Sequence, residues 1–250
     1  MTKRCFLLGA AALLAVATAH GSILNVSIGI RETEAGGGTV GVPIGGNGGT
    51  LGGIEFVNLD GQSLTLDGTF QTFTFNFQND ALTAFAGTTA NSVYDGTRGV
   101  LEHIRFRNIS GELGPISLYV DNVRAISPTG AVTTVTDFEG WANGTEVSFQ
   151  EPRFSGSTSS NLLTTPNIAG VSDAFASQGL ASYNVQFQFV DATNTRWVRL
   201  TTNGLTNLPN PVIEFGQGWQ LKFDVRGEVV PEPTGAALLL LAAPALRRRR

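Results

Sequence analysis

Hydrophobic and polar residues alternate in many short segments of this chain, and this period of two predicts β-strands with one face in a core. Over residues 70–78, Phe73, Phe75 and Phe77 share one face and polar side chains share the other. Over residues 101–108, apolar side chains alternate with one histidine and two arginines. The same pattern predicts further strands at 23–31, 53–59, 116–126, 132–138, 145–149, 183–190, 196–201, 212–215 and 221–225.

Turn-forming pairs such as Asp67-Gly68 and Asn143-Gly144 separate these segments. No long segment between the two chain ends has the 3.6-residue period of an amphipathic helix. Many short strands separated by turns are typical of sandwiches and barrels. We therefore predict an all-β fold, an antiparallel β-sandwich.

Turn residues over 127–130 interrupt the alternation, and a new apolar alternation starts at Val132. We therefore expect two sandwiches in tandem, a first domain over 20–130 and a second over 131–228. The two halves share a weak order of strand types that ends in similar closing segments. This similarity leaves a true duplication and a chance likeness equally open, because antiparallel strands resemble one another.

The first 19 residues have the three parts of a secretory signal peptide. Lys3 and Arg4 precede an apolar core over residues 6–16, and small residues follow at Ala17-Thr18-Ala19 before His20. We expect a signal helix that is cleaved after Ala19.

The C-terminal segment, residues 229–250, forms a fourth region of the chain. It contains Pro231, Glu232 and Pro233, an apolar run over 235–246, and then Arg247, Arg248, Arg249 and Arg250. A twelve-residue helix would be ~18 Å long, against ~30 Å for the hydrocarbon core of a membrane. The short helix is therefore a poor permanent span, and the terminal arginines would keep its end on the cytoplasmic side.

This three-part tail resembles the PEP-CTERM sorting signal of Gram-negative bacteria. The resemblance implies recognition near Pro231-Glu232-Pro233 by an exosortase-type processing enzyme and transient anchoring in the inner membrane. It also implies a cell that makes extracellular polysaccharide. The alternative is a plain C-terminal tail anchor that contains Pro-Glu-Pro by chance.

Charge and cysteine content argue against several kinds of partner and site in the exported body, namely nucleic acid, disulfides and thiolate metal sites. Six of the 16 basic residues and one of the 20 acidic residues, Glu232, lie in the two end segments, so the body carries ten basic residues against 19 acidic ones. Such an acidic body disfavours nucleic acid as a partner. The single cysteine, Cys5, lies in the signal peptide, so the mature chain can form neither a disulfide nor a thiolate metal site.

Two segments are similar to the last and first strands of jelly-roll carbohydrate-binding modules. These are Leu118-Tyr119-Val120-Asp121-Asn122-Val123 and Asp137-Phe138-Glu139-Gly140. The resemblance implies jelly-roll-like domains and a structural calcium ion held by Glu139 and, in the same half, Asp224. The alternative is that both carboxylates are exposed or capped turn residues.

A sugar site needs an aromatic plate and planar hydrogen-bonding side chains beside it. Strand parity places Trp197 and Arg199 on a polar face, and Asn184, Gln186 and Gln188 on the polar face of another strand. We expect these five residues to be a glycan-binding site. The alternative for Trp197 is packing in the core or at a sheet edge.

Catalysis has little support in the sequence, because His103 is the only histidine well inside the mature chain and no nucleophile or metal motif is present. We therefore expect a non-enzymatic protein of the cell surface or extracellular matrix that is associated with extracellular polysaccharide or is structural. The alternatives are a purely structural surface protein without a ligand and a surface glycosidase.

Overall fold

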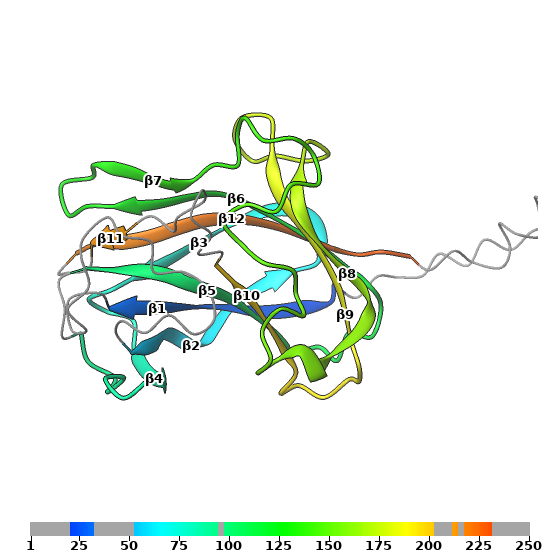
Figure 1. Ribbon diagram of the computed structural model, residues 1–250, viewed down its shortest axis with the longest axis horizontal. Helices are drawn as coiled ribbons and strands as arrows, with labels where there is room; N and C mark the ends of the chain where they lie inside the picture. The colour runs from blue at the N-terminus through cyan, green and yellow to red at the C-terminus, as the bar shows by residue number, and fades with distance from the viewer. Residues whose placement is uncertain (1–20, 33–52, 95–97, 203–211, 215–217, 232–250) are drawn as a thin grey trace, which may run out of the picture.

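The computed structural model describes residues 21–32, 53–94, 98–202, 212–214 and 218–231 (Figure 1). The expected signal peptide over 1–19 and the tail from Glu232 onwards lie outside these residues. Within them the chain is all-β, with two antiparallel sheets and a single turn of 3-10 helix, η1 (Ser159–Asn161). No helix in this part of the chain is long and apolar enough to cross a membrane.

Each sheet has six strands. Sheet A consists of β1 (Ile23–Glu32), β2 (Ile54–Thr65), β4 (Leu82–Ala86), β5 (Arg98–Asn108), β10 (Trp197–Thr201) and β11 (Val212–Glu214). Sheet B consists of β3 (Asp67–Asn76), β6 (Ile116–Ile126), β7 (Val132–Thr136), β8 (Leu162–Ser172), β9 (Ser182–Phe189) and β12 (Gln220–Val229). The strand orders are β10-β5-β1-β2-β4 and β3-β12-β6-β9-β8, with β11 beside β5 and β7 beside β6.

The apolar faces predicted from the alternation form the core between the sheets. Phe73, Phe75 and Phe77 are buried as expected, and Phe73 and Phe75 stack on Phe223 of β12 with ring centroids 5.9 and 5.7 Å apart. On β5, Ile104 and its inward neighbours are fully buried. Burial of these large side chains supplies the main driving force for pairing the two sheets.

Strands from both sides of residue 130 mix in both sheets, which differs from the expected pair of tandem domains. In sheet B, β12 lies between β3 and β6, and in sheet A, β10 and β11 pair with β5. One buried cluster contains side chains from both halves, including Leu24 and Phe223. The similar closing segments 119–124 and 222–226 belong to β6 and β12, which are neighbours with Asp121 opposite Asp224. The two similar segments are therefore adjacent strands of one sheet and have similar surroundings.

Glutamine side chains form hydrogen bonds between β2 of sheet A and β3 of sheet B, where the chain passes from one sheet to the other. Gln71 accepts a hydrogen bond from the Thr65 backbone nitrogen (3.1 Å) and donates one to the Thr65 carbonyl oxygen (2.7 Å). Gln62 donates to the Thr74 carbonyl oxygen (2.8 Å). These bonds satisfy backbone groups at a sheet edge that would otherwise be open to another chain.

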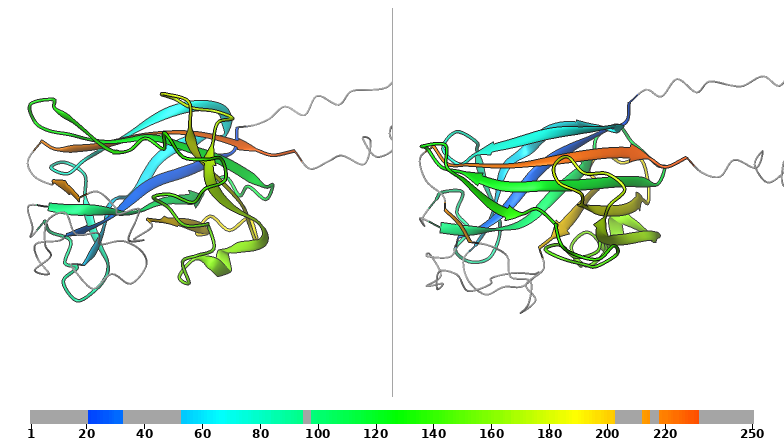
Figure 2. Two further views of the ribbon diagram at one scale, coloured as in Figure 1. Left: turned by 45° about the horizontal axis from the view of Figure 1, so that its top comes forward. Right: turned by 90° about the horizontal axis from the view of Figure 1, so that it is seen from above.

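The first and last described residues lie at the same end of the sandwich (Figures 1 and 2). The segment before β6 joins them, because Glu112 accepts hydrogen bonds from the Ser22 hydroxyl and from the Gly114 backbone nitrogen. The Val230 backbone nitrogen donates to the Pro115 carbonyl oxygen (2.7 Å). Both chain ends therefore leave the body at one pole.

Candidate functional site

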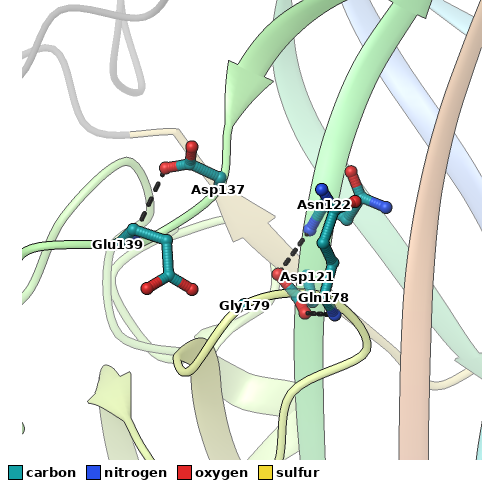
Figure 3. A pocket seen from close by; sticks show the side chains of 6 residues that line it. All are labelled: Asp121, Asn122, Asp137, Glu139, Gln178 and Gly179. Carbon is teal, nitrogen blue, oxygen red and sulfur yellow. Dashed lines mark hydrogen bonds between the residues drawn. The ribbon is translucent and has the colours of Figure 1, made fainter.

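A small acidic pocket opens on the outer face of sheet B (Figure 3). Its volume is about 130 Å³, and its lining comes from the middle of β6, the turn after β7 and the loop between β8 and β9. The lining residues are Asp121, Asn122, Asp137, Glu139, Gln178 and Gly179. The pocket thus brings together residues of segments 118–123 and 137–140.

Phe138 positions the two carboxylates of the turn after β7. It has a φ of +61°, a costly conformation for a bulky residue, and its side chain is only 1% exposed. Its ring stacks on Tyr183 at 5.4 Å and tilts against Phe149 at 6.2 Å. Phe138 is held in the core, and Asp137 and Glu139 on either side of it line the pocket (Figure 3).

Asp121 reaches the pocket from an irregular point in β6. The pairing of β6 with β12 shifts register between Lys222 and Asp224, and Asn122 has a φ of +51°. Asp121 is almost fully buried, and one of its carboxylate oxygens accepts from the Asn122 backbone nitrogen (2.6 Å). Burial raises the pKa of Asp121, although hydrogen bonds from Gln178, Ser177 and Asn122 act in the opposite direction.

The β8–β9 loop, residues 173–181, lies over these carboxylates. The backbone nitrogens of Ser177 and Gln178 donate to Asp121 at 2.7 and 3.0 Å. Those of Leu180 and Ala181 donate to Glu139 at 2.8 and 3.0 Å. The two acidic residues therefore satisfy four backbone donors of one loop.

Gly179 allows this close approach. Its φ is +71°, and a Cβ atom at this position would lie 2.1 Å from a carboxylate oxygen of Glu139. Glycine is the residue that accepts such a conformation without strain and leaves room for the carboxylate.

Asp224, the second expected calcium ligand, has a different set of partners from Glu139. It accepts hydrogen bonds from the Thr72 hydroxyl (2.7 Å) and the Asn122 amide (3.1 Å), and it lies 3.5 Å from the Arg124 guanidinium. Hydrogen-bond donors thus occupy both oxygens of Asp224 and one oxygen of Glu139, so these partners do not fit a calcium ion held between the two carboxylates. No cluster of three or more acidic, histidine or cysteine side chains in the described ranges could hold a metal ion.

The five residues of the expected glycan site do not come together. Trp197 and Arg199 lie on β10 of sheet A, whereas Asn184, Gln186 and Gln188 lie on β9 of sheet B. The alternation of side chains along each strand correctly placed all five residues away from the apolar core. It could not predict which strands share a sheet.

Trp197 and Arg199 are packing residues on the outer face of sheet A. Trp197 is half-buried, its ring lies 5.9 Å from that of Phe56, and the Arg105 guanidinium carbon lies 5.1 Å from its centroid. Arg199 is 3% exposed and donates to the Glu102 carboxylate. The alternative interpretation of Trp197, packing at a sheet edge, describes its position.

Arg199 belongs to a buried polar cluster that includes His103. His103 Nδ1 lies 2.5 Å from a Glu102 carboxylate oxygen and 3.2 Å from Arg199 Nε, and Arg31 lies 3.9 Å from the same carboxylate. Burial would raise the pKa of Glu102, but the His103 hydrogen bond and the Arg199 charge outweigh it and bring the pKa to about 2. A Cβ on Gly29 would lie 2.0 Å from the His103 ring, so the imidazole occupies space that glycine leaves free.

The three amides of β9 have separate roles. Asn184 is buried and donates to the Ser117 hydroxyl and the Leu118 carbonyl oxygen, both at 3.0 Å. Gln186 donates to Asn184 (3.0 Å), whereas Gln188 donates to the Leu113 carbonyl oxygen (2.7 Å). Of these three amides, Gln186 and Asn184 are therefore in contact with each other on the outer face of sheet B, whereas Gln188 is bonded to Leu113.

The structure adds an aromatic residue and an arginine beside these amides. Phe175 of the β8–β9 loop is 40% exposed, and its ring centroid lies 5.0 Å from that of Tyr119. The Arg226 guanidinium carbon lies 3.6 Å from the Phe175 ring centroid. Sequence periodicity gave no signal for Phe175, because it lies outside any strand.

Comparison of the chain with protein-family models, curated proteins and solved structures finds no match.

Proposed function

We propose that this chain is an exported bacterial protein of the cell surface or extracellular matrix, whose β-sandwich associates with glycans and has no catalytic role. A signal peptide starts export, and a PEP-CTERM tail that an exosortase-type enzyme processes delivers the body. The observation that carries the proposal is that the start of β1 and the end of β12 lie at one pole of the sandwich (Figures 1 and 2).

This arrangement matters for a protein that is held by its tail. The segment before β6 links both chain ends through Glu112 and Pro115, so the attachment point is joined to the folded body. A tail fixed at a membrane would hold this pole, and both sheets would extend away from it. The outer faces of the sandwich would then be free to meet extracellular polysaccharide.

The bonding of the pocket carboxylates supports a non-catalytic role. Asp121 and Glu139 accept backbone hydrogen bonds that fasten the β8–β9 loop. A general acid needs a proton to give and a base needs a free lone pair, whereas both oxygens of Asp121 and one oxygen of Glu139 are used as structural acceptors. The resemblance of segments 118–123 and 137–140 to carbohydrate-binding modules supports the association with glycans.

Processing of the tail provides the first test. In a host with an exosortase-type enzyme, we expect the wild-type protein to lose its tail near Pro231-Glu232-Pro233, as mass spectrometry of the C-terminus would show. Replacing these three residues by alanine should leave a longer, membrane-bound form, because the enzyme then has no motif to recognise. Pro128→Ala, in a turn of the body, is the control and should be processed normally.

Two other outcomes would overturn parts of this proposal. Recovery of the intact chain in the cytosol would contradict export. Turnover of a polysaccharide by the purified body would favour the glycosidase alternative, whereas no binding to any glycan would favour a purely structural surface protein.

A further inference from the structure

We propose that the outer face of sheet B beside Phe175 binds one pyranose ring of an uncharged polysaccharide, with the sugar stacked on the Phe175 ring. This inference rests on the proposed association with glycans and assigns it to a surface. We name this surface, formed by Phe175, Tyr119, Arg226, Glu228 and Gln186, the Phe175 platform.

The Phe175 ring is both exposed and fixed. It is 40% exposed, although a large apolar side chain gains free energy when it leaves water. The Ser182 hydroxyl donates to the Phe175 carbonyl oxygen (2.6 Å), Tyr119 meets the ring at an interplanar angle of 78°, and Arg226 stacks on it. A plate that is already held in place loses little conformational entropy when a ligand binds.

Strand register places polar groups around this plate. Arg226 of β12 lies opposite Tyr119 of β6, which lies opposite Asn184 of β9. In the neighbouring row, Glu228 and Gln186 lie on either side of Ser117. Because side chains two residues apart share a face, both rows belong to the same outer surface as Phe175.

Arg226 supports the platform from beneath, and Glu228 offers an acceptor beside it. One terminal nitrogen of Arg226 donates to Glu228 (2.8 Å), and its guanidinium stacks on the Phe175 ring. Arg226 is only 9% exposed, whereas the Glu228 side chain is 37% exposed. The Glu228 carboxylate is therefore the acceptor that a hydroxyl group of a bound sugar can reach.

Charge selects an uncharged sugar. Glu228 already neutralises Arg226, and Asp224 lies next along the outer face of β12. The body as a whole carries about twice as many acidic as basic residues. Because Arg226 pairs with Glu228 and Arg124 lies 3.5 Å from Asp224, a carboxylate-bearing sugar would find these positive charges already paired. A neutral pyranose can donate hydrogen bonds to Glu228 and Gln186 without needing a free cation.

The test measures binding of the mature protein to immobilised neutral glucans, mannans and galactans, with alginate and polygalacturonate as acidic competitors. We expect a neutral glycan to bind, and Phe175→Ala to weaken its Kd roughly tenfold through loss of the stacked ring. Phe154→Ala is the matched control, because Phe154 is also 40% exposed and lies on a different loop. Gln186→Ala should weaken binding less than Phe175→Ala, and Trp197→Ala should leave it unchanged.

The outcomes separate this inference from the proposed function. If no glycan binds the wild type, the association with glycans fails, and the platform fails with it. Trp141, just after the turn that follows β7, is another exposed aromatic residue, at 46%. If a glycan binds but Phe175→Ala has no effect, or Trp141→Ala or Trp197→Ala abolishes binding instead, the platform is wrong while the association stands. Preference for the acidic polymers would overturn the assignment to an uncharged sugar.

Discussion

At the residue scale, His103 shows how the environment sets the properties of a side chain. Its imidazole is fully buried beside Gly29. Burial lowers the pKa of His103 most strongly, and the charges of Arg199 and Arg105 lower it further, although Glu102 acts in the opposite direction. The folded state therefore favours the neutral ring.

This makes stability depend on pH. The unfolded chain binds a proton near the ordinary value of 6.5, so the contribution of neutral His103 is present above that pH and is lost as the pH falls below it. We expect the free energy of unfolding, from urea denaturation, to fall by about 1 kcal/mol between about pH 7.5 and 5.5. His103→Gln should show a smaller dependence.

His20→Gln is the control for this prediction, because His20 is the other histidine of the chain. It should retain the wild-type dependence on pH. An unchanged slope in His103→Gln would show that the titrating group lies elsewhere.

At the element scale, the β8–β9 loop is held on sheet B by side chains from two other elements. Glu139→Ala removes the acceptor for the backbone nitrogens of Leu180 and Ala181, and we expect it to lower the free energy of unfolding by about 1–2 kcal/mol. Asp137→Ala is the matched control: its carboxylate also lines the pocket, but it is exposed and bonds only within its own turn, so the change should stay within about 0.5 kcal/mol.

Thermal melts of the wild type and of Glu139→Ala test for calcium. Because donors occupy one oxygen of Glu139 and both oxygens of Asp224, we expect equal melting temperatures for the wild type in EDTA and in calcium chloride. A higher melting temperature with calcium that Glu139→Ala abolishes would show that the hydrogen bonds give way to a metal ion.

At the scale of the whole molecule, the mixed sheets predict that neither half folds alone. A fragment 131–228 contains β12 without either of its neighbours, β3 and β6. We expect fragments 20–130 and 131–228 to show no cooperative melting by circular dichroism, whereas residues 20–231 melt in one transition. A sigmoidal transition in either fragment would restore the two-domain interpretation.

Much of the fold could be predicted because side-chain alternation is a local property. Phe73, Phe75 and Phe77 follow a period of two, so the strand can bury all three rings only when that face is turned toward the core. The candidate site was harder to predict. The Phe-Glu-Gly turn pointed to Glu139, but the partners of its carboxylate come from a loop about 40 residues later in the chain.

The sequence by itself determined most of the strands and their buried faces, because both depend on residues that are near one another in the chain. The expected strand over 145–149 does not form, and β4 and β8 were not predicted. Only the tertiary structure decided which strands are neighbours. It placed Trp197 and Asn184 in different sheets and brought Phe175, Tyr119 and Arg226 together. The physical reason is that many pairings of similar antiparallel strands bury their apolar faces equally well, and packing of the whole core selects one of them.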